Sequence, residues 1–414
     1  MLEQTVIIAG GQGSRLKPLI NNTPKLLMDI NGLKMIDHQI DYLQKNSIKK
    51  IHFCLGFGSD KILDYIQSKE INYTYSIEES PLGTYGALAN SKKYLDSKFF
   101  VLYSDILTNF DIQKNYRKFD SLNSDFHLIL RYTNHPNDSD IITITDTKNV
   151  IGINKSSDLN YPYMPIGNTA LFFGKQSAIQ TKNLNIPSDI FKDYLKINKG
   201  NYKITGSFSI DYIRDIGTVD RYKSEVPQYS SKIKKPYKVA LLDRDGTLIE
   251  DQGNENKINK LKFKEQSLDI LSYLQENYYK IFLISNQPGI AKGFFSFKDV
   301  ERFHAELQHQ LIKKGFEPLD GIYFCPHHPE AGHKGEIKKL KVVCDCRKPS
   351  IGLVEEIKRD HDLRNSQFIV LGDTFSDYEL SLKLNANFYL IKSELTEMEK
   401  FLNLNIKPHE TNVI

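Results

Sequence analysis

Short runs of Val, Ile, Leu and Phe recur along the chain, and most of them end at a small or polar residue. The first half contains TVIIAG, KKIHFCLG and KFFVLYSD, and the second half contains KVALLD, KIFLIS and QFIVLGD. Nearly continuous apolar runs of this length are typical of parallel strands buried on both faces. The polar residues that follow them predict functional loops at the carboxyl ends of the strands.

Stretches with helical periodicity separate these runs. The segment FKDVERFHAELQHQLIKKG, for example, repeats apolar residues at helical spacing and ends at Gly315. This alternation predicts an α/β fold with two domains, and the length of 414 residues also exceeds one ordinary core. The stretch QYSSKIKKPYK is polar, basic and without an apolar period, so we expect domains at 1–229 and 238–414 joined by a linker at 230–237.

Charge is close to balance, with 55 basic and 51 acidic residues and a net charge of +4. It gives no electrostatic argument for nucleic acid or membrane as a partner. Small-molecule substrates are compatible with this charge, and a homo-oligomer stays open. The start, MLEQTVIIAGG, lacks the features of a signal peptide. No run approaches the roughly 18 apolar residues of a membrane span. The cytoplasm is the expected location.

A glycine-rich segment, AGGQGSRLKPL, belongs to the first strand end. Gly10, Gly11 and Gly13 let a ligand approach the backbone, whose N–H groups can cradle phosphate oxygens. Arg15 adds a forked phosphate donor, and Lys25 of TPKLL adds a second cation. The glycine spacing fits neither a Walker loop nor the dinucleotide fingerprint, and a bare glycine motif is more often a simple turn. The assignment therefore depends on the other motifs.

Six motifs identify the first domain. GGQGSRLKPL, TPKLL, PLGTYGAL, LYSD, IGNTALF and DIGTVDRY resemble, in this order, the motifs of the sugar-1-phosphate nucleotidyltransferase family over nearly all of residues 2–222. The resemblance implies a Rossmann-like domain that uses a nucleoside triphosphate and Mg²⁺. It assigns the triphosphate to Gly10, Gly11, Gly13, Ser14 and Arg15, the transferring phosphate to Lys25, the base pocket to Gly83 and Thr84, Mg²⁺ to Asp105 and Asp215, and the sugar phosphate to Lys155 and Asn168.

The chemistry agrees with this inventory. Attack of a sugar phosphate on the α-phosphorus requires charge neutralisation and alignment, which Mg²⁺, Lys and Arg supply. Two positions depart from the family pattern. Asn154 stands where Glu is usual before Lys155, and Tyr85 stands where a small residue is usual.

The second domain begins with KVALLDRDGTL, in which Asp243 and Asp245 follow an apolar run. In extended backbone this spacing points both carboxylates into one crevice, where one can attack a phosphoryl group and the other can protonate the leaving oxygen. The order of this motif, Ser285-Asn286, Lys348 and Asp373 resembles the haloacid-dehalogenase phosphatase superfamily.

That resemblance implies a Rossmann-like fold with Asp243 as the nucleophile and Asp245 as the general acid and base. Mg²⁺ would be held by Asp243, Asp373 and the backbone carbonyl of Asp245, with support from Asp377. The remaining residues assigned to the phosphoryl group are Ser285, Asn286, Arg347 and Lys348.

Three of the four cysteines cluster late in the chain. Cys325 and His327, followed by Cys344 and Cys346, make a complete tetrahedral set for Zn²⁺, which predicts a structural zinc loop. His328 could replace His327. Cys54 lies alone in an apolar run and is expected in the core.

The motifs DRDGT, SNQPGIAKG, CPHHP, CDCRKP and GDT look like the heptose-bisphosphate phosphatase group, which also includes histidinol phosphatases. The two resemblances together imply consecutive steps: heptose 1,7-bisphosphate loses its 7-phosphate, and the heptose 1-phosphate is activated with GTP as the α-anomer. Three alternatives stay open: a histidinol phosphatase, a transferase for another sugar such as mannose 1-phosphate, and an inactive N-terminal binding module. Intact Arg15, Lys25, Asp105 and Asp215 argue against the last.

Overall fold

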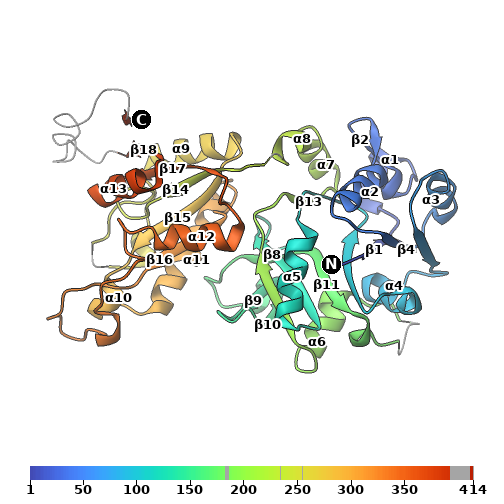
Figure 1. Cartoon of the computed structure of the whole chain (residues 1–414), viewed down its shortest axis with the longest axis horizontal. Helices are drawn as coiled ribbons and strands as arrows, with labels where there is room; N and C mark the ends of the chain where they lie inside the picture. The colour runs from blue at the N-terminus through green and yellow to red at the C-terminus, as the bar shows by residue number, and fades with distance from the viewer. Residues whose placement is uncertain (182–185, 234, 254, 392–410, 414) are drawn as a thin grey trace. The chain divides into compact units, whose positions relative to one another are not determined.

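The computed structural model describes residues 1–181, 186–233, 235–253, 255–391 and 411–413 (Figure 1). Contacts between residues divide the chain into two compact units. The first unit contains Met1–Arg131, His135–Leu159 and Ile166–Ile233. The second unit contains Tyr132–Asn134, Asn160–Pro165 and Lys234–Ile414. In the described part of the chain, no helix is both long and apolar enough to cross a bilayer.

The first unit is built on a mixed sheet. Its strands are β1 (Gln4–Ala9), β4 (Lys50–Leu55), β5 (Tyr73–Ile77), β6 (Lys98–Tyr103), β8 (Phe126–Tyr132), β9 (Ile141–Ile144), β10 (Val150–Asn154), β11 (Ile166–Lys175) and β12 (Ile204–Phe208). The strand order is β10-β9-β11-β6-β1-β4-β5, and β8 pairs with β11 and β12. The predicted apolar runs form β1, β4 and β6, which are adjacent and parallel at the centre of the sheet.

Two short strand pairs complete this unit, β2 (Asp29–Ile30) with β3 (Leu33–Lys34) and β7 (Ile106–Thr108) with β13 (Ile213–Asp215). The α-helices are α1 (Lys17–Ile20), α2 (Met35–Lys45), α3 (Ser59–Ile66), α4 (Gly83–Asn90), α5 (Ile112–Leu122), α6 (Lys196–Asn198), α7 (Val219–Glu225) and α8 (Tyr229–Lys232). Burial explains the strand assignments, because Phe53, Phe100 and Phe173 are fully buried together in the core.

The second unit contains a parallel sheet with strands β14 (Lys238–Leu242), β15 (Lys280–Asn286), β16 (Gly321–Cys325), β17 (Gln367–Gly372), β18 (Asn387–Leu390) and β19 (Thr411–Val413). The order is β16-β15-β14-β17-β18-β19. Its helices are α9 (Glu265–Glu276), α10 (Gly289–Lys292), α11 (Phe297–Lys313), α12 (Gly352–His361) and α13 (Phe375–Leu384). The strand order reverses between β14 and β17, the point where open α/β sheets bind ligands.

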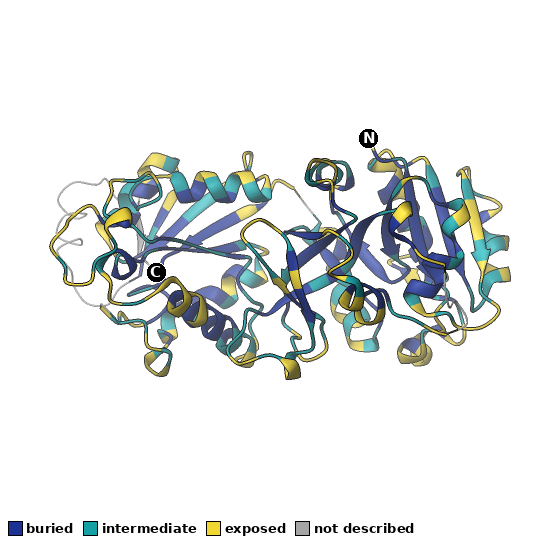
Figure 2. Ribbon diagram, turned by 90° about the horizontal axis from the view of Figure 1, so that it is seen from below, coloured by how far each residue is buried: buried dark blue, intermediate teal, exposed yellow. Residues whose placement is uncertain are grey.

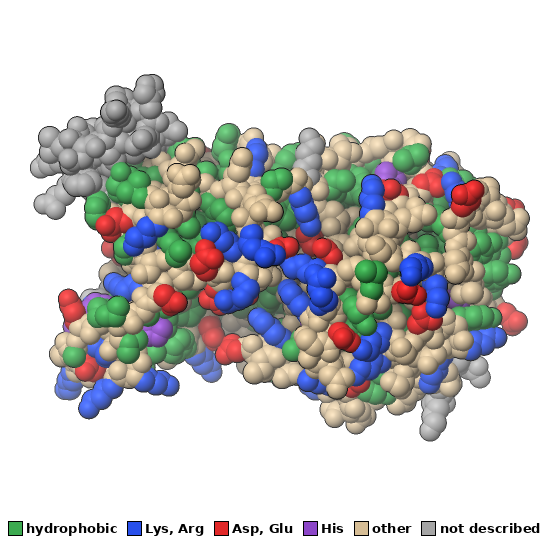
Figure 3. Space-filling view, in the orientation of Figure 1, with side chains coloured by type: hydrophobic (Ala, Val, Ile, Leu, Met, Phe, Trp, Pro, Cys, Tyr) green, Lys and Arg blue, Asp and Glu red, His purple; other side chains and the backbone are tan. Residues whose placement is uncertain are grey.

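Burial follows the predicted pattern in each unit. Figure 2 shows buried strands and helices whose outer faces are exposed. Helix α11 illustrates the cause: Phe303, Leu307 and Leu311 are fully buried at helical spacing. Its start is fixed by a capping box, in which Ser296 accepts from the Asp299 N–H and Asp299 accepts from the Ser296 N–H. On the face drawn in Figure 3, acidic and basic side chains are interspersed, in agreement with the near-balanced composition.

The segment expected to be a linker is partly structured. Residues Tyr229–Lys232 form α8, Tyr229 is buried, and the carbonyl of Ile233 accepts from Asn109 at 2.9 Å. Residues 230–233 therefore belong to the first unit. Tyr229 and Ile233 lie four residues apart, so one helical turn brings both against the same core. Two apolar residues at this spacing in an otherwise polar stretch were too few to predict a helix. Lys234 of the expected linker and residues 392–410 of the expected second domain lie outside the described residues.

Candidate active sites

Two carboxylates of the first unit come together because β13 pairs antiparallel with β7. Asp215 ends β13 opposite Ile106, the residue after Asp105. The N–H of Ile216 donates to the carbonyl of Asp105 at 2.9 Å. A Cβ atom on Gly217 would lie 2.7 Å from an Asp215 oxygen and 2.8 Å from an Asp105 oxygen. The two residues predicted to bind Mg²⁺ thus lie on either side of the glycine of DIGT.

Each of these carboxylates holds a cation. Lys25 Nζ donates to Asp105 at 2.5 Å, and Arg221 donates to Asp215 at 2.6 Å. Burial, followed by the charge of Asp105, raises the pKa of Asp215, as expected when two carboxylates share a site. Two carboxylates that face each other at one site suit a divalent cation. Asp105 and Asp215 would hold Mg²⁺ here, and the ion would neutralise phosphate charge.

The glycine loop lies beside this pair, at the carboxyl end of β1. Gly13 has a φ of 63°, a left-handed conformation that favours glycine, and caps the 3₁₀ turn Ser14–Leu16. A Cβ atom there would lie 3.2 Å from Cγ of Lys25, so the loop packs against the lysine stem. Arg15 is exposed, and the described residues offer it no hydrogen bond or ion pair. The loop that contains Gly10, Gly11, Gly13, Ser14 and Arg15 therefore lies against Lys25, and its binding of a triphosphate stays a prediction.

Gly83 and Thr84, predicted to line the base pocket, also contact residues 188–190. A Cβ atom on Gly83, whose φ is 73°, would lie 2.5 Å from the carbonyl oxygen of Ser188. The Thr84 hydroxyl donates to Asp189 at 3.2 Å and accepts from the Ile190 N–H at 2.9 Å. Residues 188–190, distant in sequence, therefore pack against this loop, and its role in the base pocket stays a prediction.

The predicted sugar-phosphate residues also contact protein. Lys155 forms an ion pair with Asp140 at 2.8 Å. Asn168 accepts from the Ala170 N–H at 2.9 Å. Sequence reasoning did not single out two other residues at this edge of the sheet, Arg221 and Glu78. Glu78 directly follows β5, and its carboxylate lies against Gly10.

The site in the second unit lies where the strand order reverses. Asp243 follows β14 and Asp373 follows β17. Asp243, Asp373 and Asp377 offer oxygens that all lie within 4.8 Å of one another. Lys348 Nζ lies 2.7 Å from Asp243 and 2.6 Å from Asp377. Three carboxylates and one ammonium leave two negative charges in excess, which matches one divalent cation.

The electrostatics of this cluster agree with that match. Burial raises the pKa of Asp243 to about 8, with Lys348 opposing and Asp377 adding to the shift. Burial also raises the pKa of Asp373. The neighbouring carboxylates raise the pKa of Lys348, although burial opposes them, so this ammonium stays charged. Mg²⁺ held by Asp243 and Asp373 would stabilise their ionised forms and neutralise phosphate charge.

Asp245 is held differently from the prediction. Strand β14 ends at Leu242, so the backbone from Asp243 to Asp245 turns and is not extended. Arg244 donates to both oxygens of Asp245, at 2.9 and 3.0 Å, and Gln287 donates to one at 3.0 Å. The carboxylate of Asp245 is therefore clamped outside the three-carboxylate cluster. Arg244 and Gln287 were not singled out from the sequence, because only the turn brings them to Asp245.

The remaining predicted residues surround the cluster. Asn286 accepts from the Lys348 N–H at 2.9 Å and donates to the Lys348 carbonyl at 3.1 Å, so it positions the lysine. Ser285 is buried and its hydroxyl accepts from Gln287 at 2.7 Å. Arg347 donates to the carbonyl of His327 at 3.4 Å. Thr247, not singled out from the sequence, donates to Asp373 at 2.9 Å.

The four predicted zinc ligands converge. The Sγ atom of Cys346 lies 3.1 Å from that of Cys325 and 3.3 Å from that of Cys344, and Nδ1 of His327 lies 3.2 Å from Cys346. These separations are too long for a disulfide of about 2 Å. They approach the roughly 3.8 Å edge of a tetrahedron with Zn–S bonds of about 2.3 Å. The donor set fits Zn²⁺ with His327, whereas Nδ1 of His328 is buried without a hydrogen-bond partner among the described residues.

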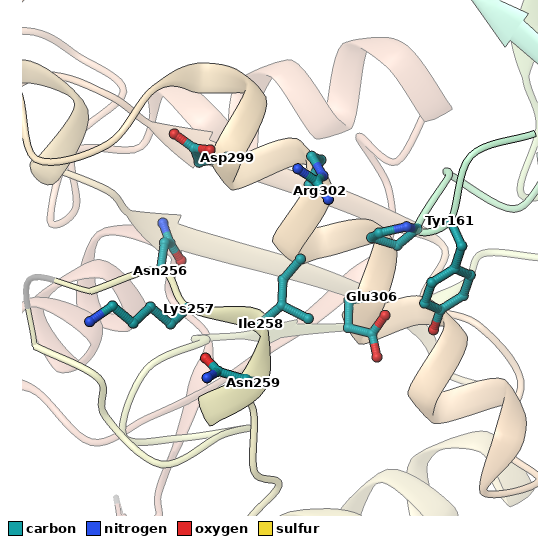
Figure 4. A pocket seen from close by; sticks show the side chains of 9 residues that line it. Tyr161, Asn256, Lys257, Ile258, Asn259, Asp299, Arg302 and Glu306 are labelled. Carbon is teal, nitrogen blue, oxygen red and sulfur yellow. The ribbon is translucent and has the colours of Figure 1, made fainter.

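A pocket of about 480 Å³ in the second unit lies near Asp245 (Figure 4). Asn256 and Glu306 line it, together with Arg302 of α11 and Tyr161. Asn256 also donates to Gln287 at 3.2 Å, and Gln287 contacts Asp245. Two hydrogen bonds thus connect the pocket wall to Asp245.

Comparisons with known proteins agree with two enzymatic units. Residues 4–154 match the family described as Nucleotidyl transferase, and residues 238–381 match the family described as Polynucleotide kinase 3 phosphatase. The chain is 36% identical over 140 residues to the D-glycero-beta-D-manno-heptose-1,7-bisphosphate 7-phosphatase of Haemophilus ducreyi, covering 34% of this chain and 74% of that protein. The Helicobacter pylori protein of the same name is 35% identical over 161 residues, covering 38% and 86%.

Two solved structures resemble the chain. One is the crystal structure of HddC from Yersinia pseudotuberculosis, with 24% identity, a TM-score of 0.48, and coverage of 55% of this chain and 100% of that chain. The other, from Bacillus anthracis, is assigned as a glucose-1-phosphate thymidylyltransferase, with 18% identity, a TM-score of 0.50, and coverage of 56% and 97%. The second likeness shows the fold alone. The chain therefore belongs to the D-glycero-beta-D-manno-heptose-1,7-bisphosphate 7-phosphatase family, and it carries a nucleotidyl transferase domain in addition.

Proposed function

We propose that the chain carries out two consecutive steps in the activation of a heptose. The second unit removes the 7-phosphate of D-glycero-D-manno-heptose 1,7-bisphosphate, and the first unit transfers GMP from GTP to the heptose 1-phosphate, releasing pyrophosphate. One observation carries the proposal: a single chain contains a nucleotidyl transferase domain and a site typical of heptose-bisphosphate phosphatases. The product of such a phosphatase is a sugar 1-phosphate, the substrate class of such a transferase.

In the phosphatase, Asp243 attacks the 7-phosphate and forms an aspartyl phosphate, which water then hydrolyses. Asp245 donates a proton to the leaving sugar oxygen and later accepts one from the attacking water. Lys348 and Ser285 stabilise the charge of the transferring phosphoryl group. The clamp of Arg244 and Gln287 orients Asp245. Mg²⁺ would be held by Asp243, Asp373 and the backbone carbonyl of Asp245, and Arg347 would contact the substrate.

The pocket beside Asp245 supports a substrate larger than a simple phosphate ester. It offers about 480 Å³ and polar groups from Asn256, Asn259, Arg302 and Glu306. Hydroxyl-rich ligands require such mixed donors and acceptors. We assign it to the part of the substrate that is remote from the scissile phosphate.

In the transferase, the glycine loop and Arg15 bind the triphosphate, and Lys25 neutralises the α-phosphate. Asp105 and Asp215 would hold Mg²⁺, which lowers the charge opposing attack by the sugar phosphate. Lys155 and Asn168 would contact that sugar phosphate. The structure pairs Lys25 with Asp105 and Arg221 with Asp215, so substrate binding must redirect these two cations. The choice of GTP as the donor follows from the resemblance of the two domains to the enzymes of heptose activation.

The zinc loop serves the phosphatase indirectly. Cys346 immediately precedes Arg347 and Lys348. Zn²⁺ held by Cys325, His327, Cys344 and Cys346 would therefore fix the chain that presents both cations. The ion has no contact with the reacting phosphate in this proposal.

The test is a coupled assay on the full chain with heptose 1,7-bisphosphate, Mg²⁺ and each nucleoside triphosphate in turn. We expect release of one phosphate and formation of a nucleotide-diphosphate heptose. The variant Asp243→Asn should release no phosphate but should still transfer nucleotide to supplied heptose 1-phosphate, because the amide cannot form the aspartyl phosphate. Hydrolysis of histidinol phosphate in preference to the bisphosphate, or transfer only to mannose 1-phosphate, would overturn the proposal.

A further inference from the structure

Glu306 places a buried carboxylate in the wall of the pocket near Asp245. The residue belongs to α11, is 7% exposed, and lines the pocket together with Asn256 and Arg302 (Figure 4). One of its oxygens, Oε1, accepts from the Gln310 amide at 2.9 Å. The other oxygen, Oε2, is buried and has no hydrogen-bond partner among the described residues. Burying an acceptor without a partner is unfavourable, so a ligand that brings a donor would be stabilised here.

The other side chains of the pocket do not supply this donor. Tyr161 lines the same pocket, and burial together with the neighbouring Glu306 raises the pKa of its phenol, yet Oε2 of Glu306 stays without a partner. Asn256 shows the same deficit. Its amide nitrogen donates to Gln287 at 3.2 Å, whereas its Oδ1 atom is buried without a partner among the described residues. The pocket wall therefore holds two buried acceptors that require donors from a ligand.

The hydrogen bonds to Asp245 indicate which part of a substrate fills the pocket. Gln287 accepts from Asn256 at 3.2 Å and donates to Asp245 at 3.0 Å, so the path from Asn256 to Asp245 is no longer than about 9 Å. Asp245 is proposed to protonate the leaving oxygen, which belongs to the sugar and not to the transferred phosphate. With that oxygen at Asp245, the neighbouring pocket receives the rest of the leaving group.

Arg302 disfavours a leaving group that carries a positive charge. It is exposed, it lies one helical turn before Glu306 on α11, and it forms no hydrogen bond or ion pair with the described residues. Side chains at this spacing are neighbours on a helix, so a ligand with an ammonium group would meet the guanidinium as well as the carboxylate. Neutral hydroxyls on an anionic sugar phosphate are compatible with both groups.

We propose that Glu306 selects a sugar as the leaving group of the phosphatase, by accepting a hydrogen bond from a sugar hydroxyl at Oε2, while Oδ1 of Asn256 accepts from a second hydroxyl. This inference rests on the proposed phosphatase activity and adds the residues that recognise the leaving group. A hydroxyl is both a donor and an acceptor, so it can donate to these oxygens and accept from Arg302. Hydrogen bonds to a charged acceptor are the stronger ones, which makes Glu306 the main determinant.

The first arm of the test compares two bisphosphates with the same number of carbon atoms. D-glycero-D-manno-heptose 1,7-bisphosphate carries the sugar hydroxyls, and heptane-1,7-diol bisphosphate keeps both phosphates without them. The wild-type kcat/KM for phosphate release should be at least about 100-fold higher for the sugar, because the diol leaves both buried acceptors without partners. This comparison needs no variant and is therefore independent of folding.

The second arm uses Glu306→Gln in the full chain. The amide removes the charged acceptor, so kcat/KM for the sugar bisphosphate should fall at least about tenfold while that for the diol bisphosphate stays unchanged. Glu301→Gln, at an exposed position of α11 outside the pocket lining, is the matched control and should keep both activities. Asn256→Ala should lower both activities, because Gln287 loses a contact, but should lower the activity toward the sugar more. A melting temperature no lower than that of the wild type reports that each variant is folded.

The outcomes separate this inference from the proposed function. A wild-type protein that hydrolyses the diol bisphosphate as well as the sugar bisphosphate overturns the inference and leaves the phosphatase standing. So does a Glu306→Gln variant that keeps the wild-type kcat/KM for the sugar, or one that loses activity equally toward both substrates. A wild type that releases no phosphate from the heptose bisphosphate overturns the proposed function and this inference with it. A loss in Glu306→Gln that is confined to the sugar bisphosphate supports the inference.

Discussion

The ammonium of Lys348 lies 2.7 Å from a carboxylate oxygen of Asp243, the residue proposed as the nucleophile. Asp377, fully buried, holds the same ammonium at 2.6 Å, and Asn286 fixes the lysine backbone with two hydrogen bonds. Lys348 is therefore a preorganised cation beside the reacting carboxylate, which is the arrangement that stabilises charge developing in phosphoryl transfer.

Replacing Lys348 with Met should lower kcat for phosphate release by about 100-fold or more, because it removes a donor aimed at the transferring group. The loss should appear mainly in kcat, measured as phosphate released from the bisphosphate over a range of substrate concentrations. Lys358→Met on α12 is the control, since Lys358 pairs with Glu355 on the surface. A Lys348→Met enzyme within threefold of the wild-type kcat would contradict the role of this residue.

In the first unit, Asp105→Asn and Asp215→Asn should each lower Mg²⁺-dependent pyrophosphate release by at least about 100-fold. Each variant removes one of the two carboxylates proposed to hold the ion, and it frees Lys25 or Arg221 from its ion pair. Phosphate release by the second unit should stay unchanged in the same preparations. Asp220→Asn, at an exposed position close in sequence to Asp215, is the matched control. Normal transfer by both variants would exclude these carboxylates as the metal site.

The sequence predicts well which residues end a strand. It predicts poorly which residues from distant parts of the chain contact them. Asp105, Asp243 and Asp373 were identified because each closes a nearly continuous apolar run, and the structure places each one within two residues after the end of a strand. Glu78 was missed because the preceding strand, β5, has the sequence YTYSI. This strand lies at the edge of the sheet, is largely exposed and has no apolar run from which its end could be predicted. Strand propensity without burial gives only a weak signal.

Other residues were missed because tertiary contacts alone bring them to the site. The clamp on Asp245 needs Gln287, which follows a different strand, and a turn after Leu242 that an extended DxD motif does not predict. Gly83 and Thr84 carry a motif that predicts ligand contact, and the structure adds contacts with Ser188–Ile190 that the motif does not predict. A motif identifies the residue type that a position requires, but it does not identify the distant residue that this side chain contacts.

His127 should make the first unit sensitive to acid. The ring is buried between the hydroxyls of Thr205, at 2.7 Å, and Ser207, at 2.9 Å. Burial lowers its pKa from 6.5 to about 3. The unfolded chain therefore binds a proton between these values while the folded chain does not, so stability is full above the unfolded pKa and is lost as the pH falls from 6.5 toward 3. At pH 5 the loss is about 2 kcal/mol.

Hydrogen exchange of β8 and β12 at pH 7.5 and pH 5, corrected for the intrinsic rate, measures this loss where it occurs. His127→Gln cannot titrate, so it should be less stable than wild type at pH 7.5 but should show a smaller loss of protection at pH 5. His135→Gln, at an exposed position, is the control and should respond like the wild type. An equal loss in wild type and His127→Gln would show that another group controls the acid response.

The zinc loop gives a prediction with four separable readouts. Elemental analysis should find about one zinc per chain, the amount that a single four-ligand site requires. Cys344→Ser should lower the zinc content and should expose the segment between Cys325 and Cys346 to limited proteolysis, because metal binding contributes the folding energy of such a loop. Phosphate release should fall, because Arg347 and Lys348 lose the anchor that precedes them, and nucleotidyl transfer should not change.

Two further variants identify the ligands. His327→Gln should behave like Cys344→Ser, whereas His328→Gln should keep its zinc, because it is His327 that places Nδ1 against the Cys346 thiol. Cys54→Ser, at the one cysteine of the first unit, should also keep its zinc, since that thiol lies beside Ser91 in the core. Zinc-free protein with full phosphatase activity and an intact loop would show that the three clustered cysteines are ordinary thiols. Zinc retained by His327→Gln and lost by His328→Gln would instead reassign the fourth ligand.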